Sequence, residues 1–292
     1  LPGGKTITVF FYNQHLSTMV SFDPGSTSNA DSFLQTYAAP QVRDDDTPQF
    51  LLIASDGELY GHHQPFRDKF LSYLTTSSIR KSQFVLSYPG LWLQQHPATE
   101  TIAILPKTSW SCHHDLLRWS GNCGCTPNGD WKTALRAGLQ KIGALVDYEY
   151  EQEAGNYVDD VWELRHRYIE VLLGRIKLNE LLAELEAKTI SIEETTILDL
   201  LLSAQVERQR MFTSCGWFFE DFDRIEPRNV VAYAAQAVWM TYLATGKDLT
   251  NEAEELMGKV VSWRSGLRGD VVFQQHYIRA KEFYQHLLSV SQ

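Results

Sequence analysis

The sequence predicts an α/β region followed by an all-α region. In the first region, apolar runs with the composition of buried strands alternate with stretches in which apolar residues recur at helical spacing. The strand-like runs cover residues 6–12, 49–54, 84–87 and 101–105, and the helical stretches cover residues 29–39 and 64–75. This alternation is typical of a parallel sheet covered by helices, or of part of a barrel.

From Trp131 onward the apolar residues keep helical spacing, which predicts a helical bundle. One predicted core stripe consists of Trp131, Leu135, Leu139, Ile142 and Val146. We therefore divide the chain into residues 1–130 and 131–292, and we expect the two regions to pack against each other.

Three sets of residues mark predicted helix ends. Ser191 followed by Glu194 has the spacing of a capping box, and Asn251 followed by Glu254 repeats that spacing with an asparagine. Gly246 stands where a helix is expected to end, because glycine often occupies the position after the last helical residue.

Composition and charge exclude several classes of protein. The 292 residues carry 26 basic and 36 acidic side chains, and the net charge of −10 is unlike that of a nucleic-acid-binding protein. The sequence has no run of eighteen apolar residues, so we do not expect it to span a membrane. Nucleic acids and membranes are therefore not expected partners, and a neutral or cationic ligand is favoured.

The chain begins with Leu1 rather than Met, so we expect it to be part of a longer protein. Its four cysteines, Cys112, Cys123, Cys125 and Cys215, are too few for a disulfide scaffold of this size. Cys123 and Cys125 are also too close in sequence to bridge each other comfortably. A reducing, cytoplasmic location is expected.

Residues 55–63 are the sharpest local feature, because they follow the predicted strand of residues 49–54 and carry two carboxylates and two imidazoles. Ligands of α/β proteins bind at the carboxyl ends of strands. Asp56 is a candidate proton donor there, because a neighbouring carboxylate raises the pKa of a carboxyl group and Glu58 stands two residues away. The alternative is an Asp-Gly turn with solvated polar neighbours.

This segment resembles the motif that carries the general acid/base in glycoside hydrolase family 57, an Asp-Gly-Glu tripeptide after a buried strand, followed by an aromatic residue and Gly61. Residues 9–22, which begin Val-Phe-Phe-Tyr-Asn, are similar to the segment that precedes the acid in that family. Residues 108–125 and 213–219 are similar to a bacterial branch of long family 57 proteins without an assigned activity, whose C-terminal portion matches most of this chain.

The resemblance implies part of an incomplete (β/α)7-type barrel packed against the C-terminal helices, and a retaining glycosidase or glucanotransferase acting on α-glucosidic bonds. Asp56 is then the general acid/base. Retention requires a second carboxylate about 5 to 5.5 Å away as nucleophile, and in the family this glutamate precedes the matched segments. We therefore expect the nucleophile upstream of Leu1 and the isolated chain to be inactive.

The implied partners are an oligo- or polysaccharide substrate and the N-terminal catalytic portion of the parent chain. The resemblance implies no cofactor and no metal. Where many family members have Ser-Asp-Trp, this sequence has Cys215-Gly216-Trp217, which removes a carboxylate from the expected substrate site. That departure favours an alternative, a non-catalytic carbohydrate-binding or structural module on the same fold.

Several side chains are candidates for substrate binding, because imidazoles donate hydrogen bonds to sugar hydroxyls and the apolar face of a sugar packs on indole. They are Glu58, His62, His63, Trp110 and Trp217. The alternatives are surface imidazoles at a helix N-terminus and tryptophans of the core. The acidic run of residues 220–223 is interpreted as a solvated turn.

Three cysteines are candidate zinc ligands, because Zn²⁺ prefers thiolates and imidazoles. They are Cys112, Cys123 and Cys125, with Cys215 or a histidine as the fourth ligand. The sequence has no Cys-x-x-Cys pair of the zinc-ribbon type, so buried or loop-stabilising cysteines are the alternative. A third possible function, a metal hydrolase, would use these cysteines together with His62 and His63.

Overall fold

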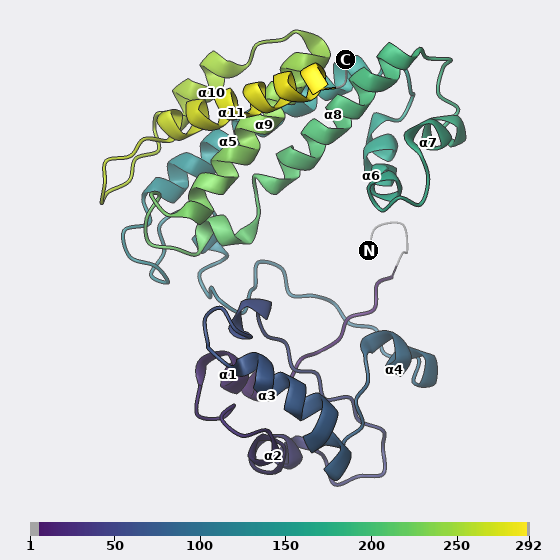
Figure 1. The fold of residues 1–292 in the computed structure, drawn as a ribbon, viewed down its shortest axis with the longest axis vertical. Coiled ribbons are helices and arrows are strands. Elements are labelled where there is room, and N and C mark those ends of the chain that lie inside the picture. Colours follow the sequence, from purple (N-terminus) through teal and green to yellow (C-terminus); the bar gives the residue numbers. More distant parts are fainter. Residues whose placement is uncertain (1–5, 291–292) are drawn as a thin grey trace. The chain divides into compact units, whose positions relative to one another are not determined.

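The computed structural model describes the backbone of residues 6–290 and the side chains of residues 6–284. The chain forms two compact units, Leu1–Ile104 and Leu105–Gln292 (Figure 1). The division lies upstream of the one predicted from the sequence, so the segment with three of the cysteines is part of the second unit.

Short helices and tight turns make up the first unit. The helices are α1 (Gln14–Phe22), α2 (Ala30–Ser32), α3 (Arg67–Tyr73) and α4 (Pro89–Gln95). Wider helical turns extend α2 through Phe33–Ala38 and α3 through Leu74–Ser78. A small core packs around Phe33, whose ring meets that of Phe70 edge-on with centroids 5.5 Å apart. Helices therefore form close to the two stretches predicted for them.

The predicted sheet is not formed within residues 6–290, so the prediction of an α/β region with part of an incomplete (β/α)7, or TIM-type, barrel is wrong. The four apolar runs are irregular, and many of their apolar side chains are exposed. Ile7 is 68% exposed, Phe11 72% and Val85 88%. Composition of the β type reports a local preference, whereas a strand forms only where a neighbouring segment pairs with its backbone.

The second unit is helical from Trp131 onward (Figure 1). Its helices are α5 (Trp131–Ala154), α6 (Val161–Leu172), α7 (Leu178–Glu184), α8 (Ile192–Arg210), α9 (Ile225–Thr245), α10 (Thr250–Met257) and α11 (Gly269–Val290). α9 packs against α5, α8 and α11, and the predicted stripe of α5 is buried in this core. Within the described residues, no helix has the length and apolar character needed to cross a bilayer.

Two of the three predicted helix ends are confirmed. The N–H of Glu194 donates to Ser191 Oγ (3.2 Å) and the N–H of Ser191 donates to Glu194 Oε2 (2.6 Å), which completes the capping box of α8. Gly246 ends α9 with a φ of 71°, in the left-handed region. The third prediction is wrong, because Asn251 lies inside α10, and Asp248 Oδ1 accepts the N–H of Thr250 there (2.9 Å).

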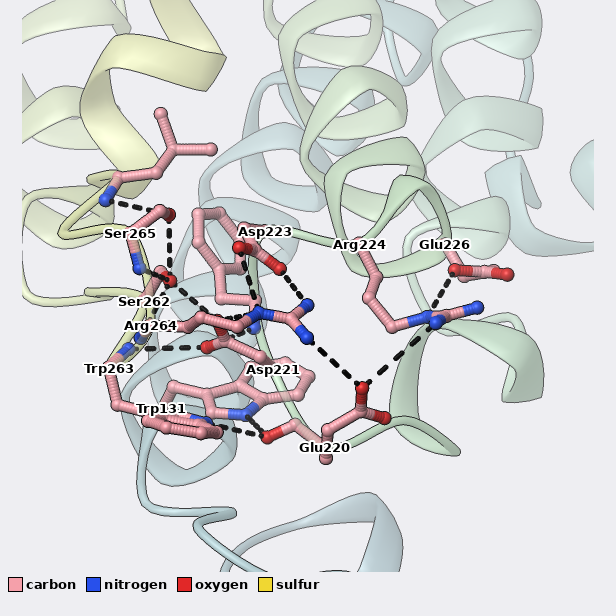
Figure 2. Close-up of polar contacts among 12 residues, drawn as sticks. Trp131, Glu220, Asp221, Asp223, Arg224, Glu226, Ser262, Trp263, Arg264 and Ser265 are labelled. Atoms are coloured by element: carbon pink, nitrogen blue, oxygen red, sulfur yellow. Dashed lines mark hydrogen bonds and ion pairs between the residues drawn. The ribbon is translucent and has the colours of Figure 1, made fainter.

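A buried carboxylate organises the end of the helical unit (Figure 2). Asp221 is 0% exposed, so the predicted solvated turn is wrong at this residue. Its carboxylate accepts hydrogen bonds from Ser262 Oγ (2.6 Å) and from the N–H groups of Phe222 (2.8 Å) and Trp263 (3.2 Å). Arg264 lies 3.6 Å from this carboxylate. The loop between α10 and α11 therefore covers the segment before α9.

Two indoles extend this network to α5. The N–H groups of Trp131 and Trp263 both donate to the main-chain oxygen of Glu220, at 3.2 and 3.1 Å (Figure 2). Arg264 also pairs with Asp223 through two contacts of 3.2 and 2.6 Å. This second pair is partly exposed, and its salt-bridge contribution to stability is correspondingly small.

We expect Asp221→Ala to lower the free energy of unfolding by about 3 to 5 kcal/mol, because it leaves several buried donors without an acceptor. Asp223→Ala, the matched control on the same segment, should cost about 1 kcal/mol or less. Urea unfolding followed by circular dichroism measures both. Equal losses of unfolding free energy in the two variants would show that the buried Asp221 carboxylate does not stabilise the fold more than the exposed Asp223 carboxylate does.

Candidate functional site

The Asp-Gly-Glu segment forms a tight turn in the first unit. Asp56 precedes a single 3-10 turn, Gly57–Leu59, and its main-chain oxygen accepts the N–H of Leu59 (3.3 Å). The Leu59 side chain is buried, and Ser55 Oγ lies 2.8 Å from the Tyr60 hydroxyl. The Asp56 carboxyl is exposed and forms no hydrogen bond with any described residue. The turn is thus anchored while its acidic group stays free.

Glu58, His62 and His63 lie together on this turn. Glu58 Oε2 is 3.0 Å from His63 Nε2, and the rings of His62 and His63 stack with centroids 4.5 Å apart. All three side chains are exposed, although their potential ligand atoms lie within 4.8 Å of one another. The Glu58 carboxylate is therefore engaged with an imidazole.

A cavity of about 440 Å³ opens next to the start of α3. Its lining includes Ser28, Asn29, Gln64, Phe66, Arg67 and Lys69. Arg67 is buried and donates to the main-chain oxygen of Val20, while its Nη2 atom has no hydrogen-bond partner among the described residues. Polar groups beside an aromatic ring suit a polar organic ligand. Asp56 does not line this cavity.

The two candidate tryptophans differ in accessibility. Trp110 is 63% exposed, and its ring centroid lies 6.1 Å from that of Phe218. Trp217 is 0% exposed and lies in the main core, with the Arg136 guanidinium 5.7 Å from its ring. A sugar cannot stack on the covered faces of Trp217 in this structure, so we retain only Trp110 as a candidate stacking platform.

Gly216, where the family 57 resemblance predicts a carboxylate in other proteins, lies in a 3-10 turn (Ser214–Trp217) against α9. Gly216 is buried, and a Cβ atom there would lie 2.6 Å from Val230 Cγ1. Such a distance is too short for two carbon atoms. The packing of the helical unit therefore leaves no room for a side chain at residue 216.

A histidine and three cysteines converge in the loop that precedes α5. Each of Cys112, His114, Cys123 and Cys125 offers one ligand atom, and these atoms lie within 4.8 Å of one another. His114 Nδ1 is 3.4 Å from Cys125 Sγ and 4.0 Å from Cys112 Sγ. Cys112 and Cys123 are buried, whereas His114 is exposed. His114, not Cys215, thus joins the three cysteines predicted from the sequence.

Short turns bring these four side chains together. Isolated antiparallel bridges close one turn at Cys112 and another at Cys123. Arg118 Nη1 and Thr126 Oγ1 both donate to the main-chain oxygen of Phe218, each at 3.4 Å. These bonds fasten the cysteine-bearing loop to the segment that leads into α9.

Hydrogen bonds in the loop favour the thiolate form of two cysteines. Burial by itself raises the pKa of the Cys112 thiol, but hydrogen bonds from the N–H groups of Arg118 and His114 and from the His114 imidazole lower it to about 6. Burial likewise opposes ionisation of Cys125, whose pKa is nevertheless lowered by Arg118 and His114. Burial raises the pKa of Cys123. Contacts with Cys125 and Cys112 raise the pKa of His114.

Lys132 is a buried cation near the same loop. It is 1% exposed, and its Nζ lies 5.5 Å from the centroid of the Trp131 ring. Burial and the charge of Arg118 lower the pKa of Lys132 to about 8, while the three thiols of the cluster act in the opposite direction. Two cations, Lys132 and Arg118, therefore lie near the cysteine cluster.

A family profile described as "Domain of unknown function (DUF3536)" matches residues 128–286. The chain belongs to the DUF3536 family. The matched residues contain the Asp221 network and Trp217, whereas the Asp-Gly-Glu turn and the cysteine cluster precede them. Searches of curated proteins and of solved structures found no match.

Sequence reasoning missed the two buried cations, Arg67 and Lys132. Lys132 follows Trp131 at the start of a helix, where a charged residue is normally solvated, and no sequence signal marks it as buried. His114 has a weak signal, because the Cys-x-His spacing of residues 112–114 mirrors the Cys-x-Cys spacing of residues 123–125.

The DUF3536 core gives a direct test of the two tryptophans. Trp217→Ala should lower the free energy of unfolding by about 3 to 5 kcal/mol, because it leaves a large cavity. Trp110→Ala, the exposed counterpart, should change it by about 0.5 kcal/mol or less. Urea unfolding measures both, and similar values for the two variants would contradict the burial described above.

Proposed function

We propose that this chain is a portion of a retaining glycosidase or glucanotransferase of the glycoside hydrolase family 57 type, acting on α-glucosidic bonds of an oligo- or polysaccharide. In this proposal Asp56 is the general acid/base, which protonates the glycosidic oxygen and later takes a proton from the attacking water or acceptor sugar. The nucleophile is a carboxylate of the parent protein outside these 292 residues.

The observation that carries the proposal is the free carboxyl of Asp56 on a turn whose other carboxylate, Glu58, is already paired with an imidazole. Ser55 contacts Tyr60, and the Glu58 carboxylate contacts His63, so Asp56 carries the carboxyl group of this turn that has no partner among the described residues. DUF3536 domains are found in glycoside hydrolase family 57 proteins, which agrees with the resemblance of the Asp-Gly-Glu motif.

The proposal requires that the Asp56 turn be covered when substrate binds. A carboxyl group donates a proton near neutral pH only where burial or a like charge raises its pKa. Among the described residues the Asp56 side chain is exposed. Substrate and other parts of the parent protein must therefore exclude water there, while His62 and His63 are available as donors to sugar hydroxyls.

The second candidate function is a non-catalytic carbohydrate-binding or structural module. The exposure of Asp56 and the closed packing at Gly216 favour it, because both argue against a complete catalytic centre. In either case we propose no nucleic-acid or membrane partner, and a cytoplasmic location in which the four free cysteines stay reduced.

Substitution of Asp56 in the complete parent protein tests the leading proposal. Asp56→Asn should lower kcat on maltooligosaccharides by about 10² to 10⁴-fold. The loss should be smaller on an aryl glycoside, because a good leaving group departs with little protonation. Asp68→Asn, which changes an exposed carboxylate of α3 outside the cavity lining, should keep the wild-type rate.

Unchanged turnover in Asp56→Asn would remove Asp56 from the acid/base role. Wild-type parent protein that binds maltooligosaccharides without turnover would instead favour the binding module. The isolated chain should bind sugar weakly and show no turnover, and robust hydrolysis by it would contradict a nucleophile outside these residues.

A further inference from the structure

We propose that Cys112, His114, Cys123 and Cys125 bind one Zn²⁺ ion in a closed structural site. The site belongs to the loop that precedes α5, and it does not rest on the function proposed for Asp56.

The spacing of the four ligand atoms fits a tetrahedral ion after a small contraction. Zinc with Zn–S bonds of about 2.3 Å and Zn–N bonds of about 2.0 Å holds its ligand atoms roughly 3.5 to 3.8 Å apart. Here all four lie within 4.8 Å of one another, and His114 Nδ1 is already 3.4 Å from Cys125 Sγ. An adjustment of roughly 1 Å at most is required. The His114 side chain is exposed and that of Cys125 is half-buried, so both have room to rotate.

The ligand types select zinc over hard cations. Three sulfurs and one imidazole nitrogen suit Zn²⁺, whereas Mg²⁺ and Ca²⁺ require oxygen ligands. Four protein ligands also fill a tetrahedron and leave no open position for substrate, which is the arrangement of structural zinc sites. The group of Glu58, His62 and His63 is exposed at every member, so it carries no comparable argument.

The surroundings of the cysteines suit a bound anionic complex. Three thiolates, a neutral imidazole and Zn²⁺ have a net charge of −1. The loop that carries the sulfurs is also fixed to the helical unit, because Arg118 and Thr126 both donate to the main-chain oxygen of Phe218. The buried Lys132 and the nearby Arg118 supply compensating positive charge.

The ion would hold a loop that has little other regular structure. Between Leu105 and Asp130 the chain forms one short 3-10 turn and two isolated bridges. Asp115 and Leu116 both adopt a positive φ, at 49° and 62°, which side chains with a Cβ rarely do. Such a backbone persists where its surroundings fix it, and a metal shared by two turns does so.

Zinc analysis of the purified 292-residue chain tests the site. After reconstitution of the reduced protein with zinc sulfate and removal of excess ion, mass spectrometry of the element should find one zinc per chain. Cys123→Ser and His114→Ala should each lower zinc affinity by at least about tenfold, measured by competition with a chromophoric chelator. Cobalt substitution should give the intense visible absorption of a tetrahedral thiolate site in the wild type, and this absorption should be reduced in Cys123→Ser and His114→Ala.

Two matched control variants test whether the loss of any cysteine or histidine lowers zinc affinity. Cys215→Ser and His113→Ala change exposed residues outside the cluster, so both should keep wild-type zinc affinity. His114 is exposed, so His114→Ala should fold, and far-ultraviolet circular dichroism verifies this for every variant.

Absence of stoichiometric zinc after reconstitution would overturn the proposal, as would equal losses in His113→Ala and His114→Ala. Thiol titration of the denatured, unreduced protein gives an independent result: four thiols agree with a metal site, and two would reveal a disulfide and overturn it. None of these measurements uses a sugar, so their failure is distinguishable from failure of the glycosidase proposal.

Discussion

The burial of the Asp221 carboxylate is the constraint on which the helical unit depends. An ionised group withdrawn from water is tolerated only where donors surround it. Two of its donors, Ser262 and Trp263, come from the loop between α10 and α11, so that loop and the segment before α9 are stable only together. The indoles that meet at the Glu220 oxygen extend this dependence to the first residue of α5, where the cysteine-bearing loop ends.

The features that the sequence predicted well are local ones. The stripe from Trp131 to Val146 is buried because residues three and four apart share a helix face, and the Ser191 capping box closes within three residues. The run of residues 84–87 failed for the opposite reason: a strand needs a partner distant in sequence, and composition does not supply one. Asp221 was misjudged likewise, because Ser262 lies 41 residues away.

The candidate sites differ in how far they are complete. The turn at Asp56 offers a free carboxyl without the enclosure that acid catalysis needs, so the acid/base role proposed for Asp56 requires other groups to cover it. The cluster around Cys112 brings its four side chains together from one loop, with the cations Arg118 and Lys132 nearby. Sequence reasoning found three of its four members, because cysteines are rare enough to stand out, whereas choosing among nine histidines required the fold.

Gly216 couples two positions that lie on different elements. A Cβ atom at residue 216 would lie 2.6 Å from Val230 Cγ1, so any side chain introduced there needs a smaller residue at position 230. A carboxylate can therefore be built into this turn only by two coordinated substitutions, one at Gly216 and one at Val230. Randomising residue 216 alone should return glycine, whereas randomising both positions together should admit small polar side chains.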